Sequence, residues 1–83
     1  MKSLIIRIER LDTQEAKKTI TVPGMMLKFA TKVLPANVSR SLEEKGIDPR
    51  EIVKLASDPE VHGVIAEIED HEKNERIIIS FAP

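Results

Sequence analysis

The sequence predicts an α+β fold: a four-stranded antiparallel sheet with three short helices on one face, in the order β-β-α-α-α-β-β. Apolar residues alternate with polar ones in segments 3–10 and 18–22 near the start and in segments 63–70 and 75–82 near the end. This period of two is typical of half-buried strands. Between them the apolar spacing becomes helical, and amphipathic helices and half-apolar strands must cover each other.

The first hairpin is predicted from SLIIRIER and KTITV. In these segments one side of each strand is apolar, and the other side carries Arg7, Glu9 and threonines, which suit a solvent face. Pro23 and Gly24 stop the second strand. The residues predicted to point inward are Leu4, Ile6, Ile8, Ile20 and Val22.

The first two helices are predicted from apolar spacing and from their end signals. A helix over residues 25–34 would bury one stripe, and Pro35 would end it. A second helix, NVSRSLEEKG, would turn Val38 and Leu42 inward and end at Gly46, a natural left-handed cap. The stripe of the first helix consists of Met26, Phe29, Ala30, Val33 and Leu34.

Several start signals agree for the third helix, in GIDPREIVKLAS. Asp48 fits the N-cap, Pro49 the first helical position, and Glu51 the position from which a side chain reaches back to the cap. Ile47 and Ile52 are spaced as a hydrophobic staple across this start.

The second hairpin is predicted from GVIAEIED and ERIIISFA. Strict alternation in the first of these strands turns Val64, Ala66 and Ile68 inward and Ile65, Glu67 and Glu69 outward. The corresponding inward residues of the last strand are Ile77, Ile79 and Phe81.

Size and composition predict one small cytoplasmic domain over residues 1–83. The chain is too short for two cores. It has no cysteine, which fits a reducing compartment and excludes thiolate chemistry. Charged residues interrupt the apolar run of MKSLIIRIERL before it reaches the length of a signal peptide, and Lys28 and Lys32 split the most hydrophobic segment, so no membrane span is expected.

The acidic stretch EIEDHEKNE has the composition of a metal or acid/base site. Its periodicity, however, predicts a strand end followed by a solvated hairpin turn, so its carboxylates should diverge. It contains no glycine for a calcium loop, and His62 and His71 lack the spacing of zinc ligands. The serines lie in no GxSxG or SxxK context, and the glycines are isolated. We therefore expect no enzyme, metal site or cofactor.

The predicted core does not account for three isoleucines. Strict alternation places Ile5, Ile65 and Ile78 on the sheet face opposite the helices. A contiguous apolar patch on such a face usually marks an interface. We therefore expect a homodimer, formed through this face or by pairing of strand edges, and an additional protein partner is compatible with it.

Residues 37–57 offer an alternative, because two short helices joined near Gly46 resemble a helix-turn-helix. A DNA-binding regulator would present Arg40, Lys45, Arg50 and Lys54 on one exposed face. However, acidic residues lie at the start of the second helix, and the net charge is only −1. Nucleic acid is thus the less favoured partner.

The chain also resembles a family. The stretches TITVPGMMLKFATKVLP, SLEEKGID and GVIAEIEDHEKNERIIIS cover most of residues 19–80. They are similar to a domain of uncharacterised bacterial proteins that often carry a SHOCT-like helical segment and are associated with envelope stress. The resemblance implies no catalytic residues and an acidic, polar turn. The absence of a catalytic motif, the near-neutral charge and the isoleucines on the second sheet face predict a non-catalytic interaction or dimerisation module. The resemblance adds the expectation of an accessory role in bacterial regulation or stress response.

Overall fold

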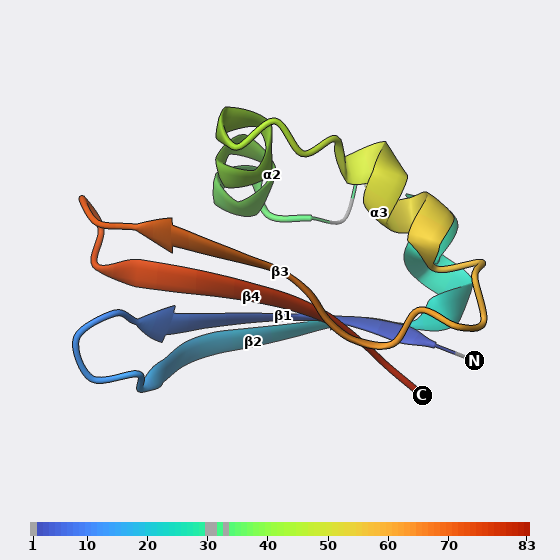
Figure 1. Cartoon of the computed structure of the whole chain (residues 1–83), viewed down its shortest axis with the longest axis horizontal. Helices are drawn as coiled ribbons and strands as arrows, with labels where there is room; N and C mark the ends of the chain where they lie inside the picture. The colour runs from blue at the N-terminus through green and yellow to red at the C-terminus, as the bar shows by residue number, and fades with distance from the viewer. Residues whose placement is uncertain (1, 30–31, 33) are drawn as a thin grey trace.

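The computed structural model describes residues 2–29, 32 and 34–83, and it contains the predicted sheet. Four antiparallel strands lie in the order β2-β1-β4-β3 (Figure 1). Their bounds are Ser3–Arg10 for β1, Ala16–Val22 for β2, Gly63–Asp70 for β3 and Glu75–Ala82 for β4. The predicted α+β class and its two hairpins are confirmed.

Pairing of the first and last strands joins the two hairpins and gives the molecule two distinct ends. Because β1 and β4 are central and antiparallel, the chain termini lie near each other at one end, and both hairpin turns lie at the other (Figure 1). A backbone hydrogen bond of 3.2 Å from Leu11 N to Asn74 O links the two turns. We call these the terminus end and the hairpin end.

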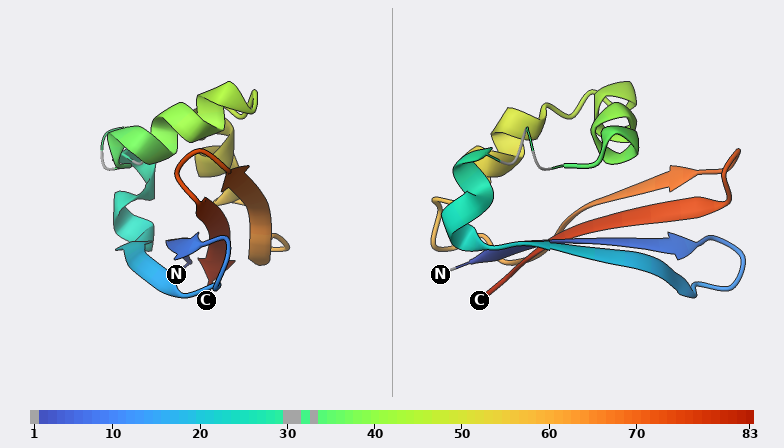
Figure 2. Two further views of the ribbon diagram at one scale, coloured as in Figure 1. Left: turned by 90° about the vertical axis from the view of Figure 1, so that its left-hand side faces the viewer. Right: turned by 180° about the vertical axis from the view of Figure 1, so that it is seen from behind.

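In the part of the chain that the structure describes, three short helices cover one face of the twisted sheet (Figure 2). They are the 3₁₀ helix η1, Gly24–Phe29, and the α-helices α2, Ala36–Glu44, and α3, Pro49–Leu55. The buried apolar residues form one cluster between the two layers, so the face away from the helices is the outer face of the sheet. The cluster consists of Leu4, Ile6, Ile8, Val22, Leu27, Leu34, Val38, Leu42, Ile52, Ile68, Ile77, Ile79 and Phe81.

The turn between α2 and α3 follows the predicted signals. Gly46 adopts φ 74°, and Ile47 N donates to Leu42 O at 2.8 Å, as in a Schellman cap. At the start of α3, Asp48 Oδ1 accepts from Arg50 N at 2.9 Å. Within the described part of the chain, no hydrogen bond joins the Glu51 side chain to this cap, so the predicted reciprocal contact is wrong.

The predicted stripe of the first helix is also wrong in part. Leu27 is buried, whereas Met26 and Phe29 are 38% and 43% exposed. A 3₁₀ helix has three residues per turn, so Leu27 faces the sheet and Met26 and Phe29 share another side. Leu34 is buried as predicted, and the predicted positions Ala30 and Val33 lie outside the described residues.

A β-bulge changes the side-chain alternation at the start of β3. Val64 pairs with Ser80 and Ala66 with Ile79, so Ile65 is an extra residue between them. Val64 is therefore 59% exposed, and Ile65 packs against the core cluster. The predicted inward position of Val64 and outward position of Ile65 are both wrong.

Among the described residues, none of the helices has the length and apolar character needed to cross a membrane.

Candidate functional site: the outer face of the sheet

Cross-strand pairing defines which side chains share the outer face near the terminus end. Ile5 lies opposite Thr21 on one side and Ser80 on the other, and Ser80 lies opposite Val64. Directly paired residues of an antiparallel sheet project from the same face. This row therefore crosses all four strands without a charge.

One step toward the hairpin end, the row becomes mixed. Ile78 lies between Arg7 on β1 and Glu67 on β3. Ile5 and Ile78 are each half-buried, so both keep part of their apolar surface in contact with water. We define the uncharged patch as Ser3, Ile5, Thr21, Val64, Ile78, Ser80 and Ala82.

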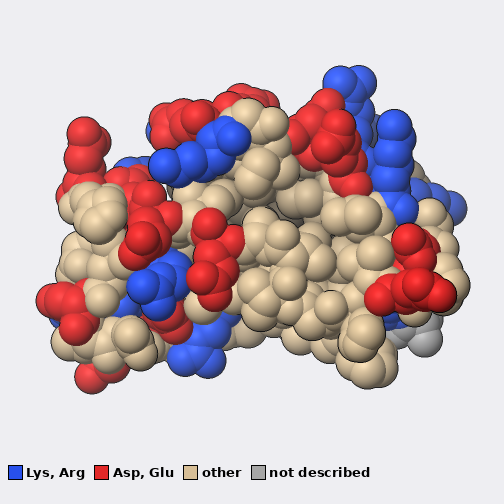
Figure 3. Space-filling model, in the orientation of Figure 1, with Lys and Arg blue, Asp and Glu red and all other residues tan. Residues whose placement is uncertain are grey.

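The space-filling view shows the same division of the surface (Figure 3). Charged side chains crowd the left part of this view, over the hairpin ends of the strands, and uncharged atoms dominate the centre, with further charged groups at the upper right and the right edge. Together with the strand pairing, this places the charged part of the outer face toward the hairpin end.

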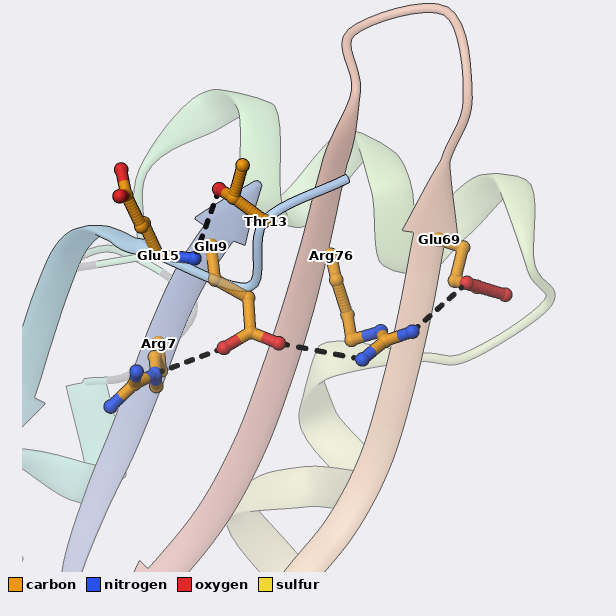
Figure 4. A network of polar contacts seen from close by, with 6 residues as sticks. All are labelled: Arg7, Glu9, Thr13, Glu15, Glu69 and Arg76. Atoms are coloured by element: carbon orange, nitrogen blue, oxygen red, sulfur yellow. Dashed lines mark hydrogen bonds and ion pairs between the residues drawn. The ribbon is translucent and has the colours of Figure 1, made fainter. Parts of the chain in front are cut away.

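The charged half is organised around Glu9, which is only 6% exposed although it lies on the outer face. Its two carboxylate oxygens accept from different guanidinium groups, Arg7 Nε at 3.1 Å and Arg76 Nη1 at 3.4 Å (Figure 4). Arg76 Nη2 also donates to Glu69 Oε2 at 3.3 Å. Strand alternation alone predicted that Glu9 would be exposed. The sequence feature that could have indicated its ion pair was Arg7, which lies two residues earlier on the same face.

The loop beside Glu9 is closed by local hydrogen bonds. Glu15 N donates to Thr13 Oγ1 at 3.3 Å (Figure 4). Arg10 Nη2 lies 3.0 Å from Asp12 Oδ2. Hydrogen bonds from Arg10 and then from the Asn74 side chain lower the pKa of Asp12.

The acidic stretch EIEDHEKNE becomes a strand end and a turn, as predicted. Asp70 Oδ1 accepts from Glu72 N at 3.1 Å and Lys73 N at 3.2 Å, and Asn74 adopts φ 54°. These bonds use Asp70 to close the turn rather than to face other carboxylates. Over residues 2–29, 32 and 34–83, no group of three histidine or acidic side chains is arranged to hold a metal ion.

The four basic residues of the alternative nucleic-acid prediction line different grooves. Arg40 and Lys45 border a groove of about 470 Å³ between α2 and the β3–β4 turn, together with the acidic Glu69 and Asp70. Lys54 borders a groove between η1 and α3.

Arg50 lies at a third surface and is engaged by its neighbour Asp48. Its Nη2 is 2.8 Å from Asp48 Oδ2. This hydrogen bonding raises the pKa of Arg50 and lowers that of Asp48. The structure therefore divides the four into two pairs, Arg40 with Lys45 at the α2 groove and Arg50 with Lys54, four residues apart on α3.

The three predicted interface residues separate in a similar way. Ile5 and Ile78 both lie on the outer face, and the bulge replaces Ile65 with Val64 there.

Comparisons with protein-family models, with curated proteins and with solved structures found no match to this chain. The resemblance to the SHOCT-associated bacterial domain stays a prediction.

Proposed function

We propose that this chain is a non-catalytic interaction module that forms a homodimer through the uncharged patch. In this proposal it acts in the cytoplasm as an accessory to bacterial regulation or stress response, in line with the family resemblance. The observation that carries the proposal is an uncharged row that crosses the whole sheet on the face left open by the helices that the structure describes. The row consists of Thr21, Ile5, Ser80 and Val64.

Charge placement supports a second copy as the occupant of this patch. A twofold axis through the uncharged patch stacks patch on patch and lets the two charged hairpin ends extend away from each other. The ion pairs of Glu9 are completed within one chain, so dimer formation need not desolvate an unpaired carboxylate. A small domain also has limited stability of its own, which association supplements.

The size of the patch predicts a weak dimer. Strands lie about 4.8 Å apart and residues on one face about 6.8 Å apart, so the patch covers roughly 200 to 300 Å². Standard interfaces bury about 800 Å² on each partner. We therefore expect dissociation in the micromolar range or weaker, with surrounding residues contributing to the contact.

Sedimentation velocity tests this proposal directly. The wild-type chain should change from monomer to dimer between about 10 µM and about 1 mM. The variant Ile5→Thr/Ile78→Thr keeps β-branched side chains on the strands but adds hydroxyls to the patch. It should dimerise at least about 10-fold more weakly, because each isoleucine loses apolar burial.

Met25→Thr is the matched control, since Met25 is an exposed apolar residue of η1 in the helical layer. It should dimerise like the wild type. A wild-type chain that remains monomeric at the highest concentration would overturn the proposal, and so would equal weakening by the control.

The alternative is DNA binding through residues 37–57. The basic residues form two separate pairs, and acidic residues accompany each pair, which weakens that alternative: Glu69 and Asp70 lie beside Arg40 and Lys45, and Asp48 lies beside Arg50 and Lys54. Retention on duplex DNA at low salt, lost on neutralising Arg40 and Lys45, would favour it over the interaction module.

A further inference from the structure

A second surface, in the helical layer, combines an apolar groove with lysines. The groove lies between η1 and α3 and has a volume of about 450 Å³. These two helices lie side by side near the N-terminus (Figure 2). The groove is lined by Lys2, Gly24, Leu27, Lys28, Val53, Lys54, Ala56 and Ser57.

The three lysines give this groove a positive rim. Within the described part of the chain, none of Lys2, Lys28 and Lys54 forms an ion pair with a carboxylate. The ammonium group of Lys2 is held in place by the carbonyl oxygens of Leu55 and Asp58. A ligand with carboxylates would therefore meet three ammonium groups that form no ion pair within the described residues, although the charge of Lys54 also acts on Asp48.

Exposed apolar side chains belong to the same two helices. Met25 and Phe29 of η1 are 70% and 43% exposed, and Leu55 of α3 is 38% exposed. The Phe29 ring lies 5.2 Å from Lys28 Nζ. Methionine is adaptable and common on surfaces that bind peptides. The surroundings of the groove thus offer apolar contacts beside positive charge.

We propose that this groove binds an acidic peptide segment of a partner protein, with an apolar side chain inserted between η1 and α3. The carboxylates of the segment would meet Lys28 and Lys54, and the apolar side chain would contact Leu27, Val53 and Ala56. The groove and the outer face of the sheet belong to opposite layers, so this inference does not depend on dimer formation.

A peptide fits these features better than an anionic membrane surface. Polybasic membrane-binding segments typically carry about 4 to 8 clustered lysines or arginines, whereas this groove has three lysines. An apolar concavity accepts a single inserted side chain, whereas a bilayer is contacted by protruding apolar residues. The charge and the shape of this surface therefore favour the peptide.

Fluorescence anisotropy with three labelled probe peptides tests the inference on the full chain. The first probe is a short peptide of alternating glutamate and leucine pairs, and it should bind. A second probe with serine in place of leucine, and a third with lysine in place of glutamate, should each bind at least about 5-fold more weakly. These two losses separate the apolar contribution from the charge contribution.

Variants then locate the binding site. Lys28→Gln/Lys54→Gln should weaken binding of the first probe at least about 5-fold, and Lys28→Arg/Lys54→Arg should retain it because the charge is kept. Arg40→Gln/Lys45→Gln removes the same charge from the α2 groove and should bind like the wild type. Circular dichroism should show the same folded spectrum for every variant.

Three results would overturn the inference. The first is no binding of the glutamate–leucine probe at any tested concentration, and the second is equal weakening by both glutamine double variants. The third is co-sedimentation with phosphatidylglycerol vesicles without any binding of the probe, which would assign the surface to a membrane.

Discussion

The two ends of the outer face differ in what their side chains contact. Charged side chains at the hairpin end pair with each other, whereas apolar side chains at the terminus end are partly in contact with water. At the hairpin end, Glu9 is buried between Arg7 and Arg76, and Arg76 Nη2 also lies 3.3 Å from Glu69 Oε2. At the terminus end, Ile5 and Ile78 keep part of their apolar surface in water.

This difference separates a surface whose charged groups pair within the chain from the surface that we propose to bind a second copy. The charged groups around Glu9 find partners within the chain, so this cluster is satisfied without another molecule. The apolar side chains at the terminus end would gain from a partner that removes them from water. The acidic stretch EIEDHEKNE, with five carboxylates in nine residues, is thus a weaker indication of a binding site than the uncharged patch.

Among substitutions that distinguish the two ends, the largest change in the free energy of unfolding is expected at Glu9. Glu9→Ala leaves Arg7 and Arg76 without their shared carboxylate and should lower the free energy of unfolding by about 2 kcal/mol. Larger losses are not expected because the Arg7 side chain is 48% exposed and water screens it. Urea unfolding measures the change.

Glu69→Ala serves as the control at the same end, since Glu69 also pairs with Arg76 but is 47% exposed. It should cost less than about 0.5 kcal/mol. Equal effects of the two variants would show that burial of Glu9 does not contribute to stability.

Salt should weaken the ion pairs of the hairpin end and leave the proposed association through the terminus end nearly unchanged. Raising NaCl from about 0.05 M to about 0.5 M shortens the screening length and weakens exposed pairs such as Arg10–Asp12. The dissociation constant of the proposed dimer should change by less than about 3-fold, because in this proposal uncharged residues make the contact between the two copies. Sedimentation equilibrium at both salt concentrations measures it. Loss of the dimer at high salt would instead assign association to charged residues.

A smaller effect is expected from acid at the hairpin end. The hydrogen bond from Arg10 lowers the pKa of Asp12 below its ordinary value of 3.8. A lowered folded-state pKa gives a stability contribution that is present above pH 3.8 and is lost as the pH falls through the folded-state value. The melting temperature should therefore fall less steeply between about pH 5 and about pH 2 in Asp12→Asn than in the wild type. Parallel curves for the two proteins would contradict this linkage.

Strands and helix caps were predictable from sequence where local patterns decide them. Alternation located both hairpins, and the spacing of Val38 and Leu42 gave the buried side of α2. Asp48 and Pro49 marked the start of α3 because these residue types satisfy free backbone groups and preset the backbone angle there.

Features set by pairing between distant segments were not predictable. The bulge at Ile65 depends on the register of β3 against β4, and one extra residue exchanges the two faces of the strand. Burial of Glu9 likewise depends on Arg76, 67 residues away along the chain. Alternation thus gave the positions of Ile5 and Ile78 on the outer face, and the position of Val64 was found only in the folded chain. Their role in an interface stays a prediction.

Intermolecular contacts between methyl groups test the central claim most directly. A sample that mixes isotope-labelled and unlabelled copies at high concentration allows nuclear Overhauser effects between copies to be selected. The proposal predicts such effects from the methyl groups of Ile5, Val64 and Ile78, and none from Met25 in η1. Intermolecular effects confined to the helical layer, or none at a concentration where sedimentation shows dimers, would contradict it.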